Sequence, residues 1–333
     1  MPRWTRRTLL SSLAAGTAAA ALGGCARGTA NPTPETLRLG HTYGVGSLQN
    51  RAATKFGDEV AERSNGSITV EVFPSGQLGS WEDMQEATEI GAMHFVIESV
   101  GSLERYTQLA AIEGLPFLYA DEEHFLSVWD GALGATMIQA IREDSGFLLL
   151  GDMYRGPRVL NSMRPVASLE EAHGLKLRVP TQETYIETWR MLGAAPTPLA
   201  LTEVFAAIEQ KAIDGQENPI DVVRFNSFYE VAPYVTNTNH IFGNFHFQTW
   251  GDTYDNWDDA TRRVVDESVA AVSAWYREIS IQETQENIDF LREEGVEFFE
   301  IDAIEWREHV LPLYETADPT VRSWVEQIQS SQS

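Results

Sequence analysis

The segment from Asp258 to Glu294 constrains the fold more than any other part of the sequence. It contains no proline and no glycine, and apolar side chains recur in it every three to four residues, at Val265, Val269, Val272, Tyr276 and Ile279. This spacing predicts an amphipathic helix, which at about 1.5 Å per residue would be roughly 50 Å long. The fold must therefore accommodate one element that is longer than a small domain is wide.

The N-terminal part of the chain alternates strand and helix patterns. Strands are predicted for TLRLGHTY, SITVEVF and HFVIESV, with helices at 49–63 and 81–91 between them. Such alternation implies an α/β fold, in which helices cover the faces of a parallel sheet.

Further elements are predicted in the second half. A short strand at 175–179 is closed by Pro180, and a helix at 201–209 has Thr202 as its candidate N-cap. FGNFHFQTW alternates as a strand does, and we expect it to cross back to the first part of the chain. Shorter packing helices are expected at 306–314 and 320–328.

The first 35 residues have the pattern of an export segment. Met1 to Gly24 begins with three arginines and continues with a charge-free run that is too short to span a bilayer of about 30 Å. We interpret residues 1–24 as a signal peptide and 25–35 as a tether. TRRTLL resembles a twin-arginine signal, with general secretion as the alternative. LGGC resembles a lipobox, which would make Cys25 a lipid anchor to the membrane. An unmodified Cys25, removed with the leader, is the alternative.

The composition narrows the function. The net charge is −25, which argues against nucleic-acid binding and against a polybasic membrane contact. With 43% hydrophobic residues, the chain can bury one large core or two moderate ones.

Two arginines and an asparagine form a candidate anion clamp. Arg178 lies at the end of the GLKLRVP strand, Arg158 follows a Gly-Pro turn and opens the run RVLNS, and Asn218 precedes Pro219. A guanidinium stays protonated and offers a planar fork of donors that matches a carboxylate. The alternatives are a structural ion pair for either arginine and a turn-organising role for Asn218.

Several motifs, in this order, resemble the solute-binding proteins of tripartite ATP-independent periplasmic (TRAP) transporters. They are VEVFPSGQLGS, GPRVLNSMRPV, GLKLRVP, LGAAPTPLALTEVF, DGQENP, FYEV and NTNHI. The resemblance implies that Arg178 pairs with a substrate carboxylate, that Arg158 is a second anion contact and that Asn218 hydrogen-bonds the same group.

The same resemblance implies a two-lobed fold with a ligand cleft between two α/β domains and a long helix that spans both. We expect domain I to comprise 36–155 and 245–283, and domain II to comprise 156–244 and 284–333. A hinge would close the lobes over the ligand.

Substrate choice is expected to depend on the first domain. The resemblance places Glu98 where a carboxylate accepts from substrate hydroxyls, although it could be a surface or helix-terminal charge. Thr42 and Trp81 are further candidates. Together with Gly101 and Leu201, they differ from the residues of the sialate-binding branch, which disfavours sialate. Trp81 could stack on a sugar ring or pack in the core. A hexuronate or aldonate is favoured over a C4-dicarboxylate.

Competing functions are less well supported by the sequence. No GxSxG, HExxH, CxxC or GxxxxGK[ST] motif occurs, so we expect no enzyme. His240 and His246, with Asp252, could be metal ligands, but structural histidines are favoured, and no metal or cofactor is expected. We expect a monomeric periplasmic receptor whose partners are a carboxylate ligand and a TRAP permease. A binding lipoprotein of an ATP-driven importer and a ligand-presenting sensory protein are the alternatives.

Overall fold

The computed structural model describes residues 35–331. The predicted signal peptide, Cys25 and the predicted tether up to residue 34 lie outside the described residues. Glu35, the last residue assigned to the tether, begins the first strand. Within the described range, no helix combines the length and the apolar character that crossing a membrane requires.

The N-terminal elements alternate as predicted. They are β1 (Glu35–Gly40), α1 (Leu48–Arg63), β2 (Ile68–Phe73), α2 (Trp81–Glu89) and β3 (Phe95–Ser99). β1 pairs in parallel with both β2 and β3. Ser47 caps α1, and Ser80 and Asp83 form a capping box on α2. Short helices follow: η1 (Val100–Arg105), η2 (Gln108–Ala110), α3 (Ala111–Gly114), α4 (Glu122–Trp129) and α5 (Ala132–Ser145).

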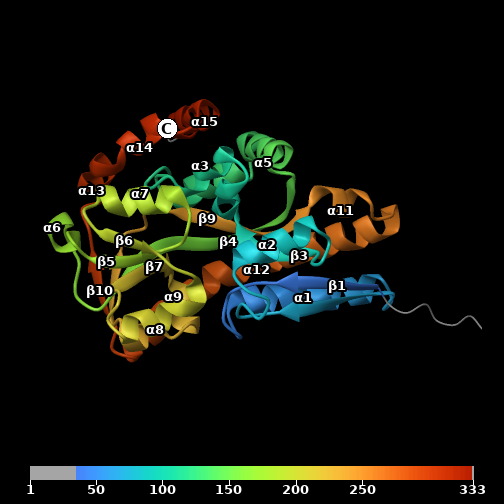
Figure 1. Ribbon diagram of the computed structural model, residues 1–333, viewed down its shortest axis with the longest axis horizontal. Helices are drawn as coiled ribbons and strands as arrows, with labels where there is room; N and C mark the ends of the chain where they lie inside the picture. The colour runs from blue at the N-terminus through green and yellow to red at the C-terminus, as the bar shows by residue number, and fades with distance from the viewer. Residues whose placement is uncertain (1–34, 332–333) are drawn as a thin grey trace, which may run out of the picture. The chain divides into compact units, whose positions relative to one another are not determined.

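Two long strands, β4 (Phe147–Ser162) and β9 (Phe242–Trp250), connect the two parts of the sheet (Figure 1). β9 runs antiparallel between β3 and β4, which confirms the predicted crossing strand. The predicted Gly-Pro turn before Arg158 is wrong. Gly156 and Pro157 lie within β4, where the pairing with β9 shifts register and Gly156 takes a positive φ of 73°. This irregularity bends the strand without ending it.

The second part of the sheet is built around β5 (Lys176–Val179), β6 (Ala195–Pro198) and β7 (Gly215–Pro219). β5 pairs in parallel with β6 and β7, whereas β7 and β8 (Tyr234–Asn237) are antiparallel to β4. The sheet is therefore mixed, in the order β2-β1-β3-β9-β4-β7-β5-β6. The purely parallel expectation is wrong, because β9 is antiparallel to β3 and β4, and β4 is antiparallel to β7 and β8.

Helices flank these strands: α6 (Leu169–Ala172), α7 (Glu183–Met191), η3 (Leu201–Glu203), α8 (Val204–Glu209), α9 (Ile220–Phe225) and α10 (Phe228–Val231). The prediction of Thr202 as an N-cap is wrong. Thr202 lies inside η3, which is preceded by Ala200, and neither η3 nor α8 has a side-chain cap.

The long helix is confirmed as α12 (Asp259–Glu293), a single element of 35 residues. It follows α11 (Gly251–Asp255) and packs against α1, α9 and β4. The chain continues with β10 (Glu297–Glu300), α13 (Ala303–Val310), α14 (Pro312–Thr316) and α15 (Pro319–Ser330). The helix predicted at 306–314 is divided into α13 and α14, because Pro312 has no N–H to continue the hydrogen-bond ladder.

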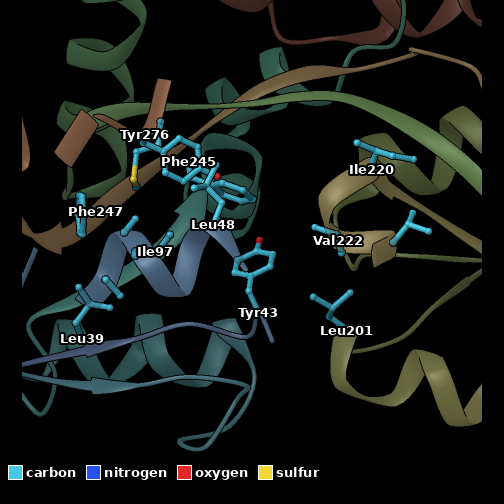
Figure 2. Packing of buried hydrophobic residues seen from close by; sticks show 14 of the residues in the cluster. Leu39, Tyr43, Leu48, Ile97, Leu201, Ile220, Val222, Phe245, Phe247 and Tyr276 are labelled. Carbon is cyan, nitrogen blue, oxygen red and sulfur yellow. The ribbon is translucent and has the colours of Figure 1, made fainter. Parts of the chain in front are cut away.

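The main hydrophobic core contains buried side chains from both parts of the sheet. Figure 2 shows Tyr43, Phe245 and Tyr276 on one side of this cluster, with Leu201 and Val222 on the other. The fold is thus two-lobed, and β4, β9 and α12 belong to the structural framework of both lobes.

Candidate functional site

All six residues predicted to bind substrate line one cavity. Thr42 follows β1, Trp81 begins α2 and Glu98 lies near the end of β3, while Arg158, Arg178 and Asn218 come from β4, β5 and β7. The cavity lies where the parallel strands β1, β3, β5 and β7 reach their carboxyl ends, the usual ligand position in α/β sheets. Leu201, which was expected to bear on substrate choice, also lines the cavity. The prediction missed other lining residues, namely Tyr43, Ser99, Arg155, Pro180, Gln182 and Tyr185.

Arg178 is the cation of this cavity that lacks a carboxylate partner in the part of the chain that the structure describes. Its side chain is buried, and Nε donates to the Leu199 carbonyl at 2.8 Å. Among residues 35–331 it forms no ion pair, so the alternative of a structural ion pair is not supported. Burial lowers the pKa of its guanidinium to about 10, an effect that the charge of Glu217 partly opposes. Arg178 is thus charged at neutral pH, and no ion pair with a described residue neutralises it.

Arg158, by contrast, is already paired. Its Nε and Nη2 donate to the two carboxylate oxygens of Glu217 at 2.5 and 2.7 Å, and Nη2 also donates to the Glu217 carbonyl at 2.7 Å. The same carboxylate lies 3.1 Å from His240 Nε2. Burial acts to raise the pKa of Glu217, but the charge and hydrogen bonds of Arg158 and the contact with His240 outweigh it and lower the pKa to about 2.

A second buried pair lies beside the first. Arg155 Nη2 donates to Glu113 Oε1 at 2.7 Å and to the Tyr185 hydroxyl at 3.2 Å. Gly243 in β9 permits this approach, because a Cβ there would collide with both members of the pair. The sequence contains one signal for these ion pairs: charged residues lie within the buried strands β4 and β7, and buried charges require partners.

Glu98 is buried, which contradicts the alternative of a surface charge. The Tyr43 hydroxyl donates to its two carboxylate oxygens at 3.0 and 3.1 Å, and the Ser99 N–H donates to Oε1 at 3.0 Å. Burial raises the pKa of Glu98 to about 7, although the hydrogen bonds from Ser99 and Tyr43 oppose the shift. Glu98 therefore changes charge near neutral pH.

Replacing Glu98 with glutamine is expected to flatten the pH dependence of stability. Between about pH 4.5 and 7 the folded state keeps a proton that the unfolded state has lost, so Glu98 lowers the free energy of unfolding as pH rises. The shift corresponds to at most about 3 kcal/mol. Between pH 5 and 8, the melting temperature should fall more steeply with rising pH for wild type than for Glu98→Gln. Exposed Glu71→Gln should follow wild type, and parallel profiles for Glu98→Gln would contradict the assignment.

The remaining predicted residues are held by their surroundings. Asn218 Nδ2 donates to Gln216 Oε1 at 2.6 Å within β7, so it does not organise a turn. Trp81 packs on Met84, Met93 and Val96, as the core alternative predicts, and it also lines the cavity.

The histidines considered as metal ligands are held by protein contacts. His240 contacts Glu217 and Thr238, and His246 Nδ1 lies 2.5 Å from the Gly151 carbonyl. In the described part of the chain, no three His, Cys, Asp or Glu side chains are grouped as a metal site would require.

The chain is similar to known binding proteins over most of its length. A family model, bacterial extracellular solute-binding protein, family 7 (DctP), matches residues 39–319. A solute-binding protein of Roseobacter denitrificans is 33% identical over 295 residues, which cover 89% of this chain and 90% of the relative.

Two solved structures are similar in fold. A TRAP periplasmic solute-binding protein from Roseobacter denitrificans with bound L-galactonate aligns with a TM-score of 0.84 and 30% identity, covering 89% of this chain and 99% of the other. One from a Polaromonas species bound to D-erythronate aligns with a TM-score of 0.83 and 28% identity, covering 89% and 98%.

Proposed function

The chain belongs to family 7 of the bacterial extracellular solute-binding proteins, and on that premise we propose that it binds a sugar acid with one carboxylate around Arg178. The family comprises substrate-binding transport proteins rather than enzymes. The receptor delivers its ligand to a TRAP permease. It works in the periplasm as a monomer, anchored to the membrane through lipidated Cys25.

The charges of the cavity support a ligand with a single carboxylate. Arg155 and Arg158 are neutralised by Glu113 and Glu217, which leaves Arg178 as the charge that a ligand can compensate. A dicarboxylate would place its second charge in this buried site without a partner, which is costly. The absence of an ion pair for Arg178 among residues 35–331 is the observation that carries the proposal.

The other polar groups suit hydroxyls. Glu98, Tyr43 and Asn218 bring acceptors and donors to the same cavity, and a polyhydroxylated chain can use both. The two similar solved structures contain galactonate and erythronate, which are acids of this kind.

A thermal-shift screen of the purified protein tests the function. Galactonate, glucuronate and erythronate should raise the melting temperature, whereas succinate should do so less. A ligand at 100 times its dissociation constant adds about 2.7 kcal/mol to the free energy of unfolding. Stabilisation by uncharged or cationic compounds alone would contradict the proposal.

A further inference from the structure

A larger cavity adjoins the cavity around Arg178. The inner one, which contains Arg178, has a volume of about 30 Å³, and the outer one about 370 Å³. Trp81 and Gln182 line both, so the two meet at these side chains. Since a single water already needs about 10–15 Å³, the inner cavity has room for the carboxylate end of a sugar acid, with the hydroxyl next to it, but not for the whole molecule.

The outer cavity has the opposite charge. Glu82, Glu104 and Glu183 line it, and its one lining cation among the described residues, Arg105, is ion-paired with Glu86. Glu82 accepts from the Thr181 hydroxyl at 2.7 Å, and Glu104 accepts from the Thr184 hydroxyl at 2.7 Å. Because a carboxylate has about four lone-pair sites, these hydrogen bonds leave acceptor capacity towards the cavity.

Gln182 stands at the junction with an unused acceptor. The residue is 8% exposed, and its Oε1 is buried and has no hydrogen-bond partner among residues 35–331. An unmet buried acceptor is unfavourable by about 1–3 kcal/mol, so a donor from a bound molecule would be favoured there. Gln182 is the N-cap residue of α7, but its side chain forms no capping hydrogen bond with the helix.

We propose that the outer cavity is a second subsite that binds the hydroxylated, uncharged far end of the acid, with Gln182 accepting a hydroxyl at the junction and the carboxylates excluding a second negative charge. The inference rests on the proposed function and extends it to chain length and charge. A sugar acid would place its carboxylate on Arg178 and its tail beyond Trp81.

Calorimetric titration with acids of increasing length tests the role of Gln182. Gln182→Met removes the acceptor but keeps a side chain of similar size. This variant should bind galactonate about tenfold more weakly than wild type does, with a smaller loss of affinity for erythronate and a loss of less than twofold for two-carbon glycolate. Exposed Gln210→Met is the matched control and should bind all three as wild type does. Equal weakening of all three acids, or no weakening of galactonate, would overturn the subsite.

The charge of the outer cavity is tested with galactarate, which is galactonate with a carboxylate at its far end. At pH 8, above the pKa of about 7 to which burial raises Glu104, galactarate should bind at least tenfold more weakly than galactonate. In Glu104→Gln, the ratio of the affinities for galactonate and galactarate should be at least threefold smaller than in wild type. Equal affinity of the two acids for wild type would overturn the inference while leaving the proposed function intact. Failure of every acid to bind would instead remove the proposed function, and this inference with it.

Discussion

Arg178→Ala is expected to weaken sugar-acid binding by at least thirtyfold. The reason is that Arg178 is the charge in the cavity without a carboxylate partner among residues 35–331. Truncating one member of a buried, hydrogen-bonded charge pair costs roughly 2–5 kcal/mol of binding free energy. Arg178→Lys should restore only part of the affinity, because an ammonium group cannot reproduce the planar fork. Titration calorimetry with galactonate measures both variants.

The stability of the unliganded variant separates a binding role from a structural one. Burial lowers the pKa of Arg178 to about 10, so its charge is unfavourable in the empty folded protein. Unliganded Arg178→Ala should therefore melt no lower than wild type, although galactonate no longer stabilises it. Arg263→Ala, at an exposed position of α12, should bind as wild type does. Unchanged galactonate affinity in Arg178→Ala would exclude Arg178 from the site.

The sequence was sufficient to predict elements that depend on local pattern. Helical periodicity predicted α12, and alternation predicted β9, because each signal is contained in one contiguous segment. Two of the errors each depend on a single residue. Pro312 divides a predicted helix, and Gly156 lets β4 continue through a predicted turn.

The sequence could not distinguish the two predicted arginines. Arg178 ends one strand-like run and Arg158 opens another, and both were expected to contact an anion. The difference depends on Glu217, which lies 59 residues from Arg158, just as Glu113 lies 42 residues from Arg155. Which carboxylate neutralises which guanidinium depends on the pairing of β4 with β7 and of β9 with its neighbours, and local spacing contains no such information.

Breaking the Arg158–Glu217 pair is expected to give the largest loss of stability. Glu217→Gln removes the negative charge but keeps the shape, which leaves Arg158 buried, charged and close to Arg178. Removing one partner of a buried ion pair destabilises by roughly 3–5 kcal/mol. In urea unfolding, the loss should appear as a lower midpoint concentration, while the dependence of the free energy of unfolding on urea concentration stays unchanged. Glu209→Gln, at an exposed position, serves as the control.

The double variant Arg158→Met/Glu217→Gln distinguishes lost charge balance from lost packing. If the single variant fails because Arg158 is left unpaired, removing that charge as well should recover part of the stability, since both members of a buried pair can be replaced together at little net cost. The net charge of the cavity would then be the same as in wild type, so galactonate should still bind to Arg178 with an affinity near that of the parent. A double variant no more stable than Glu217→Gln would mean that the carboxylate supports the fold through its contact with His240 rather than by neutralising Arg158.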